Sequence, residues 1–221
     1  MFVGHLAVGL AAKRVAPKVS LGTLLLAATF PDVLWSLFLL IGFEHVRIKP
    51  GITPVNPLDL YDFPLSHSLL MDAMWAALIA GSYFLWKKSS RGAFVLFFAV
   101  ISHWVLDFVS HRPDMPLTPW SHTYFGLGLW NSVRATLLVE GLLWCAGIVV
   151  YIRATRAKHW VGVVAFWAIV LLLTFAWIAD LGSVQPPSLR ALEIVNVISM
   201  AILLAWGYWI DTLRPPSLML A

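Results

Sequence analysis

The sequence predicts an all-α membrane protein, a bundle of about six transmembrane helices preceded by a short N-terminal helix. Of its 221 residues, 60% are hydrophobic and only 12% are charged, about half the charged share of a soluble domain. Mean hydropathy is +0.83. A soluble domain cannot cover its exterior with so few polar side chains. The composition therefore excludes a soluble enzyme and a disordered chain, and the single Cys145 excludes a disulfide-stapled secreted domain.

Six apolar stretches are long enough for a helix to cross a bilayer, which takes about 20 residues. Basic or proline-containing segments separate most of them: residues 87–91 follow the second stretch, 153–158 follow the fourth, and Pro-Pro pairs follow the fifth and the sixth. The predicted spans are residues 20–43, 65–86, 92–110, 127–152, 160–182 and 189–210.

Residues 1–12 are apolar but too short to span a membrane. No basic residue precedes them, as one would in a signal peptide, so we expect a short helix that is retained. The chain is expected to form a single integral membrane domain over residues 1–221. Residues 1–152 would hold the candidate site, and residues 153–221 would add two transmembrane helices.

Basic residues assign the loops to the two sides of the membrane, because cytoplasmic loops are enriched in Lys and Arg. If alternate loops share a side, ten Lys and Arg lie on the side of Lys13 and four on the other. The sequence therefore predicts cytoplasmic termini and outer loops over residues 44–64, 111–126 and 183–188. This topology accounts for the pI near 9.4, and since the basic residues form no concentrated patch, we expect no nucleic-acid partner.

Ionisable residues recur inside the predicted spans, where each costs a few kcal/mol unless it has a partner. An α-helix rises about 1.5 Å per residue, so the number of residues from a basic loop gives the depth of each ionisable residue in the membrane. By this count several of these residues share one layer in the outer half, with His5 lower and His67 higher. Such a collection predicts a site. Its members are His5 in the short helix and Asp32, His67, Asp72, His103, Asp107, Glu140, Asp180 and Glu193. Asp180 and Glu193 carry no motif and are expected to pair structurally.

The most specific pattern is His103, Asp107 and His111, which recur at every fourth residue. Residues at this spacing lie along one helix face, with neighbours about 5–6 Å apart. Imidazole and carboxylate groups placed in this way can bind one metal ion, or the carboxylate can bridge two. The alternative is a pair of packing or capping histidines with a salt-bridged aspartate between them.

Five further residues each have two interpretations. Asp32 follows a proline and is either a metal ligand or a cap for the kink. His67 is either a ligand or a solvated interfacial histidine. Glu140 and Arg134 either pair with each other, or act as a ligand or base and as a phosphate clamp. His122 either completes a metal site or lies in the outer loop.

Four segments together resemble the membrane-bound metal-dependent hydrolases, a bacterial family described as regulated by the SOS repressor. The segments are Gly4-His5-Leu6-Ala7, Phe30-Pro31-Asp32, Leu65-Ser66-His67-Ser68-Leu69 and His103-x3-Asp107-x3-His111-Arg112-Pro113-Asp114. Their order is more distantly similar to that in the soluble zinc-dependent phospholipases C and the trinuclear-zinc single-strand nucleases. The resemblance covers roughly the first half of the chain and implies a multi-pass protein of the bacterial inner membrane.

In those soluble enzymes the matching positions bind a zinc cluster. The resemblance implies metal ligands at His5, Asp32, His67, His103 and Asp107, with Asp107 bridging and His111 serving a neighbouring metal. The soluble enzymes add an N-terminal amine, for which Met1 offers no obvious equivalent. They also add a late His-x3-Glu pair, but Gly126 follows His122 at that spacing, so Glu140 is the nearest substitute. We therefore expect one or two zinc ions.

The leading hypothesis is a membrane-embedded, zinc-dependent hydrolase that cleaves a phosphoester of a lipid or lipid-linked substrate near the outer leaflet. Metal ions would activate water, with Asp107 and Glu140 as catalytic carboxylates and Arg134 or Arg112 as the phosphate clamp. The alternatives are a proton- or metal-coupled transporter and a non-catalytic assembly factor with a structural metal. A transporter should place polar groups at several depths reaching both faces and show broken helices in paired halves. This sequence leaves its cytoplasmic half nearly free of such groups and shows no repeat.

Overall fold

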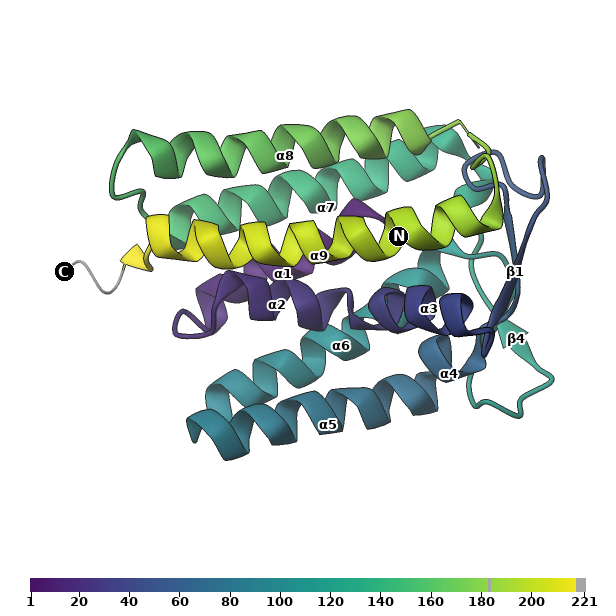
Figure 1. Cartoon of the computed structure of the whole chain (residues 1–221), viewed down its shortest axis with the longest axis horizontal. Helices are drawn as coiled ribbons and strands as arrows, with labels where there is room; N and C mark the ends of the chain where they lie inside the picture. The colour runs from purple at the N-terminus through teal and green to yellow at the C-terminus, as the bar shows by residue number, and fades with distance from the viewer. Residues whose placement is uncertain (183, 218–221) are drawn as a thin grey trace.

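The computed structural model describes residues 1–182 and 184–217, so Ser183 of the predicted 183–188 loop lies outside the described residues. The helices lie side by side, and the strands gather with the connecting loops at one end of the bundle (Figure 1). The helices are α1 (Val3–Val15), α2 (Leu21–Ala28), α3 (Phe30–Ile41), α4 (Pro64–His67), α5 (Leu69–Lys87), α6 (Ser90–Ser110), α7 (Val133–Ala154), α8 (Trp160–Asp180) and α9 (Leu189–Leu213), with a 3₁₀ turn η1 (Leu129–Asn131). Helices α5 to α9 are long and apolar enough to cross a membrane. The prediction of a helical protein with several helices able to cross a membrane is confirmed.

The predicted span 20–43 is a broken pair of helices. α2 ends at Ala28, α3 begins at Phe30, and the two are bent by 65°. Pro31 lies in the first turn of α3, where its missing N–H costs nothing, but it cannot continue the hydrogen bonding of α2. The break leaves the last carbonyls of α2 without helical partners and places Asp32 in the first turn of α3. Among the described residues, six segments are long and apolar enough to cross a membrane if this pair counts as one, and five otherwise.

Two predicted spans start before the long helices do, and the helical bundle predicted from the sequence also carries two short hairpins. The stretch from Leu65 breaks at Ser68, between α4 and α5, and the stretch from Leu127 becomes α-helical only at Val133. Ser68 and Ser132 cap the helices that follow them, which explains both boundaries. The loops at this end form two short antiparallel hairpins, β1 (His45–Ile48) with β2 (Leu58–Asp62) and β3 (Met115–Pro116) with β4 (Tyr124–Phe125).

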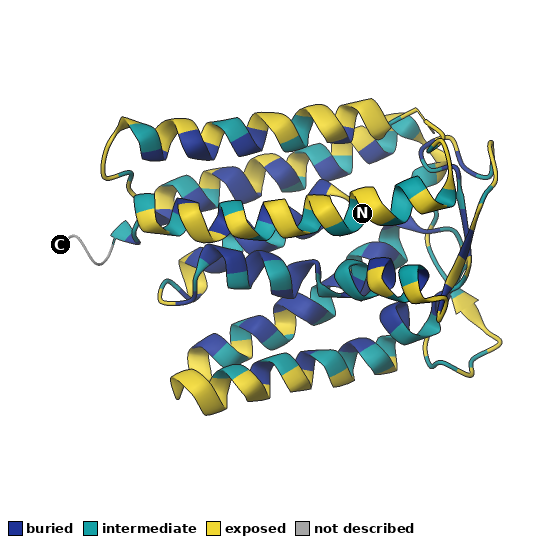
Figure 2. Cartoon of the chain, viewed as in Figure 1, coloured by how far each residue is buried: buried dark blue, intermediate teal, exposed yellow. Residues whose placement is uncertain are grey.

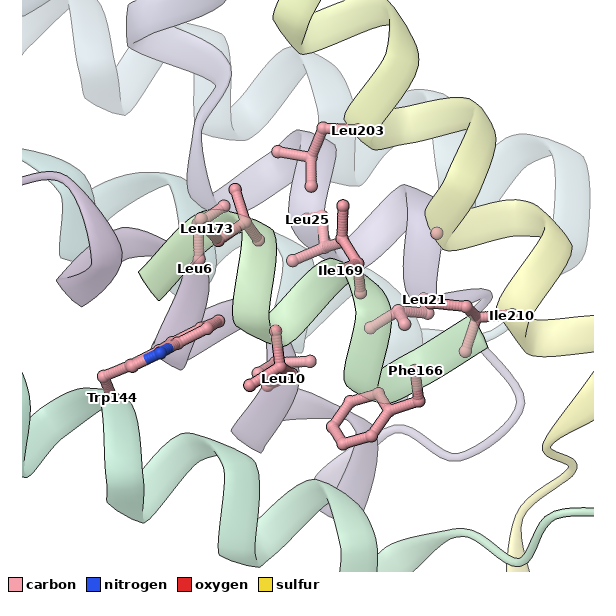
Figure 3. Close-up of a pocket in the computed structure, with 12 residues that line it drawn as sticks. Leu6, Leu10, Leu21, Leu25, Trp144, Phe166, Ile169, Leu173, Leu203 and Ile210 are labelled. Carbon is pink, nitrogen blue, oxygen red and sulfur yellow. The ribbon is translucent and has the colours of Figure 1, made fainter. Parts of the chain in front are cut away.

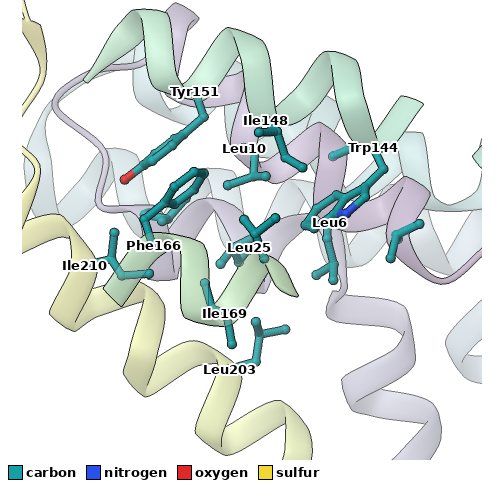
Figure 4. Close-up of a cluster of buried hydrophobic side chains, with 14 of the residues drawn as sticks. Leu6, Leu10, Leu25, Trp144, Ile148, Tyr151, Phe166, Ile169, Leu203 and Ile210 are labelled. Atoms are coloured by element: carbon teal, nitrogen blue, oxygen red, sulfur yellow. The ribbon is translucent and has the colours of Figure 1, made fainter. Parts of the chain in front are cut away.

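The short first helix is confirmed, and it runs through the interior of the bundle. α1 contacts α2, α6 and α7, and Leu6 and Leu10 pack with Trp144 of α7 in the main apolar core (Figure 4). Gly147 lets the two backbones approach closely, since a Cβ there would lie 2.7 Å from Ala7 Cα. A cavity of about 20 Å³ inside this core is lined by aliphatic and aromatic side chains (Figure 3), so it offers no chemistry for a site.

Large apolar side chains cover much of the outside of the bundle. Exposed residues run along the outward faces of α5, α8 and α9 (Figure 2), and they include Leu85, Leu171 and Phe175. An apolar exterior of this extent is the surface that a membrane covers.

The loops that carry the predicted cytoplasmic basic residues share one end of the bundle, but Met1 does not lie with them. The α1–α2, α5–α6 and α7–α8 connections and the end of α9 lie opposite the strands (Figure 1). Met1 is buried beside Asp107, where its amino group contacts the carboxylate. The expectation that both termini face the same side is therefore not supported.

Candidate metal centre

Four side chains from three helices converge beside the break between α2 and α3. Asp32 Oδ1 lies 3.6 Å from Nε2 of both His67 and His103. Asp107 Oδ2 lies 3.7 Å from His67 Nε2 and 3.1 Å from His103 Nε2. The side chain of Asp32 is 30% exposed, whereas the other three are at most 5% exposed.

The ligand atoms of Asp32, His67 and His103 lie close enough together to share one metal ion, and Asp107 lies beside the same two histidines. Ligands about 2.0–2.1 Å from a tetrahedral zinc ion lie about 3.4 Å from one another. The four distances above, 3.1 to 3.7 Å, bracket that value. Three of them are too long for hydrogen bonds, for which N···O is at most about 3.2 Å. Directly hydrogen-bonded groups would be closer than these three pairs are, whereas His103 Nε2 and Asp107 Oδ2 are within hydrogen-bond distance.

The partners of the imidazole rings leave their Nε2 atoms free to bind a cation. His103 Nδ1 lies 3.0 Å from the Ala28 carbonyl oxygen, which the helix break exposes. His67 Nδ1 lies 2.7 Å from Ser66 Oγ, and His111 Nδ1 lies 2.9 Å from Asp114 Oδ1. Because each acceptor takes a proton on Nδ1, each neutral ring presents an Nε2 lone pair. Lone pairs that converge on carboxylate oxygens repel one another unless a cation or a proton lies between them.

Glu44 and Ser66 extend this arrangement behind His67. Ser66 Oγ donates to Glu44 Oε2 over 2.6 Å, and the backbone N–H groups of Leu65 and Ser66 donate to Glu44 Oε1. Burial raises the pKa of the Glu44 carboxyl above its ordinary value, and the hydrogen bonds from Ser66 and Leu65 oppose that rise. The chain from Glu44 through Ser66 fixes the tautomer and the orientation of the His67 ring.

The other oxygen of Asp107 faces a second set of groups. His5 Nε2 lies 3.0 Å from Asp107 Oδ1, and the amino nitrogen of Met1 contacts the same oxygen and lies 3.1 Å from Ser110 Oγ. The His5 ring stacks on the His103 ring with centroids 3.7 Å apart. Two overlapping groups suit a metal ion, His5 with His103 and Asp107, and Asp32 with His67 and His103. Both groups use His103, which has only Nε2 free to bind a metal. The two groups are therefore parts of one centre, and a second ion there would share Asp107 with the first.

His5 is the least well supported of the expected ligands. Among the described residues, its buried Nδ1 has no hydrogen-bond partner, unlike Nδ1 of the other three rings. Its predicted depth is also too low, because its ring stacks on that of His103 and the two therefore lie at the same level. His111 also lies at the edge of the centre. Its Nε2 is 3.8 Å from Asp107 Oδ2, and Trp130 packs on its ring.

Four other expected residues do not join the centre. Glu140 is buried and accepts a hydrogen bond from the Phe2 N–H over 3.0 Å, so it holds the start of α1. Arg134 and His122 are exposed and do not line the cavity at the centre. Arg112 is bound by Asp59 and Asp114. The expected pairing of Glu140 with Arg134 and the expected phosphate clamp are therefore not supported.

A cavity of about 190 Å³ opens onto the centre. Asp32, His67, Asp107 and His111 contribute to its wall. Asp180, Asn196 and Met200 also line it, although the last two helices carry no motif. Glu193 pairs with Arg190, as expected of a structural residue, but Asp180 faces the cavity.

Several residues that support the centre escaped sequence reasoning. Glu44 belongs to no motif, and Ser66 and Asp114 stand in motifs of the resemblance that gave them no role. Ala28 contributes a backbone oxygen. The expectation that Met1 offers no equivalent of the N-terminal amine is wrong, since its amino nitrogen contacts Asp107. The one available signal was proximity, because Ser66 adjoins His67 and Asp114 lies three residues after His111.

Replacing Ser66 with Ala should weaken metal binding by about 10- to 100-fold, the usual effect of losing a hydrogen bond to a ligating histidine. The zinc dissociation constant of the detergent-purified protein, measured by competition with a chelator, checks this. Ser102→Ala is the matched control, since Ser102 also precedes a ligand histidine but donates to the Ala99 carbonyl of its own helix. Equal affinity in both variants would show that Ser66 does not hold His67.

No family model, curated protein or solved structure matches this chain.

Proposed function

We propose that the protein is a metal-dependent hydrolase within the membrane, acting on a phosphoester of a lipid or lipid-linked molecule. The observation that carries the proposal is the convergence of two carboxylates on the same two imidazole nitrogens: Asp32 Oδ1 and Asp107 Oδ2 each lie 3.1 to 3.7 Å from Nε2 of His67 and of His103. These distances are close to those between ligands of one zinc ion. The same spacing admits one ion, or two that share Asp107. Carboxylate and imidazole ligands are those of catalytic zinc sites.

A bound zinc ion would lower the pKa of a coordinated water toward neutrality and balance negative charge on a phosphoryl group. In hydrolysis, the water oxygen bonds to phosphorus, the bond from phosphorus to the leaving alcohol oxygen breaks, and a proton passes to that alcohol. Among the described residues, no Lys or Arg lines the cavity at the centre. The positive charge that a phosphate requires is therefore left to the metal, in place of the arginine clamp expected from the sequence.

The chain's own residues orient and shield the reaction. Asp32 is the most accessible of the four, so the substrate approaches from its side of the centre. His67, His103 and Asp107 are nearly inaccessible, which preserves their geometry and keeps bulk water away from them. The distribution of basic loops supports a site nearer the outer face of the bacterial inner membrane, and a lipid brings its phosphate to that level.

Metal content of the detergent-purified protein, measured by mass spectrometry, tests the proposal together with hydrolysis of a phospholipid panel. We expect one or two zinc ions per chain, lost in His103→Ala and retained in His45→Ala, whose exposed histidine lies in the β1–β2 hairpin. We expect wild type and His45→Ala to release a phosphoester product. Folded wild-type protein that has met no chelator and holds no metal would refute the proposal. Metal-loaded protein that cleaves no phosphoester across the panel would instead indicate a structural metal.

A further inference from the structure

A large groove lies between α8 and α9 at the end of the bundle that holds the metal centre. Its volume is about 750 Å³, and its walls are mostly apolar, formed by residues such as Leu172 and Ala176 of α8 and Val195 and Ile202 of α9. Asn56 and Pro57 of the β1–β2 connection also line it. Neither helix contributes a ligand to the metal centre, so the centre does not explain the groove.

The groove adjoins the cavity of the metal centre. Phe2, Trp35 and Met200 line both spaces, and so do Asp180 and Asn196. The first three are apolar and the last two are polar. A molecule that occupies the groove would therefore meet polar groups where it reaches the metal cavity.

The groove is also open toward the outside of the bundle. Leu172, Val195 and Ile202 line it while 51%, 58% and 52% exposed. Both helices are candidate membrane spans, so the medium outside this opening is lipid hydrocarbon, not water. Hydrocarbon chains can enter sideways without crossing an aqueous phase.

The length of the groove matches one leaflet of a bilayer. Its lining runs from Ile169 to Asp180 on α8 and from Leu192 to Leu203 on α9. Eleven residue steps of a helix span about 16–17 Å, and half of a hydrocarbon core of about 30 Å is about 15 Å. A chain of ordinary leaflet length fills such a groove, whereas a much longer polyprenyl chain would extend beyond it.

We propose that the groove between α8 and α9 binds an acyl chain of a diacyl membrane lipid, whose phosphoester thereby reaches the metal cavity. This inference rests on the proposed function and specifies its substrate class. Asn196 and Asn56 carry amides at the junction, where the glycerol ester groups of such a lipid would lie. The chain enters from the bilayer between the two helices, and the headgroup remains on the polar side.

Photocrosslinking in lipid nanodiscs tests the assignment. The probe is a diacyl phosphatidylglycerol with a diazirine on one acyl chain, and mass spectrometry locates the modified residues. We expect modification at Trp35 or Met200, at the inner end of the groove; Trp35 is buried from lipid around the bundle. Ala176→Trp, which fills the groove, should abolish this modification. Ile178→Trp is the matched control, because Ile178 is exposed on the same helix but lines none of these spaces.

Two comparisons separate this inference from the proposed function. Wild type that crosslinks at Trp35 or Met200 but hydrolyses no phospholipid would refute the enzyme and leave the groove as a lipid site. Wild type that hydrolyses phospholipid without these crosslinks would refute the groove assignment. Retained crosslinking in Ala176→Trp, or crosslinking by a photoreactive polyprenyl phosphate in place of the diacyl probe, would also overturn it. Ser199→Leu narrows the groove from α9 and should reproduce the Ala176→Trp result if that variant fails to fold.

Discussion

Replacing Asp107 with Asn should remove the bound metal and lower phosphoester hydrolysis by about 1,000-fold or more, equivalent to at least about 4 kcal/mol in the barrier. Asp107 contacts both sides of the centre. Its Oδ2 faces His67 and His103, and its Oδ1 faces His5 and the Met1 amino group. An amide has nearly the same shape but carries no charge, so the variant tests charge and coordination without opening a cavity.

Metal content and initial rates, measured on the same preparation, check this expectation. Asp62→Asn is the control, since Asp62 is exposed and pairs with His45 in the β1–β2 hairpin. Thermal unfolding in detergent shows whether the Asp107→Asn variant is folded. A folded Asp107→Asn protein with full metal content and full activity would remove Asp107 from the centre, and with it the bridging arrangement.

The parts of the site that depend on local backbone geometry could be predicted from the sequence. His103 and Asp107 share a helix face because of the 3.6-residue repeat, and that geometry holds in any α-helix. Pro31 predicted a break because its ring forbids a continuous ladder, and the break exposes the Ala28 carbonyl to His103.

What depends on packing between helices could not be predicted. Residue counting placed several ionisable residues at a similar depth in the membrane, but depth does not show which helix faces contact one another. Lys13 illustrates the error, since a basic residue near a predicted interface proved to be buried against Asp211. For the same reason the sequence predicts α8 and α9 only as additional spans, although Asp180 and Met200 line the cavity of the centre.

Replacing Gly147 with Val should destabilise the protein by about 3 kcal/mol, near the upper end for overpacking. A Cβ at this position would lie 2.7 Å from both Ala7 Cα and Ala7 O, which are backbone atoms that no side-chain rotation can move away. α1 must then shift away from α7. His5 and Met1 belong to the same segment, so their contacts with Asp107 should weaken along with the packing.

The measurement is thermal or denaturant unfolding in detergent, followed by metal analysis of the folded protein. Gly81→Ala is the matched control: Gly81 lies within α5, a Cβ there meets nothing within 4 Å, and Ala favours a helix by about 1 kcal/mol over Gly. Loss of stability with unchanged metal content in Gly147→Val would mean that α1 contributes packing alone. Loss of both stability and metal content would show that His5 and the Met1 amino group, which contact Asp107, contribute to the metal centre. Unchanged stability would contradict the close approach of α1 and α7, and with it the route by which α1 reaches Asp107.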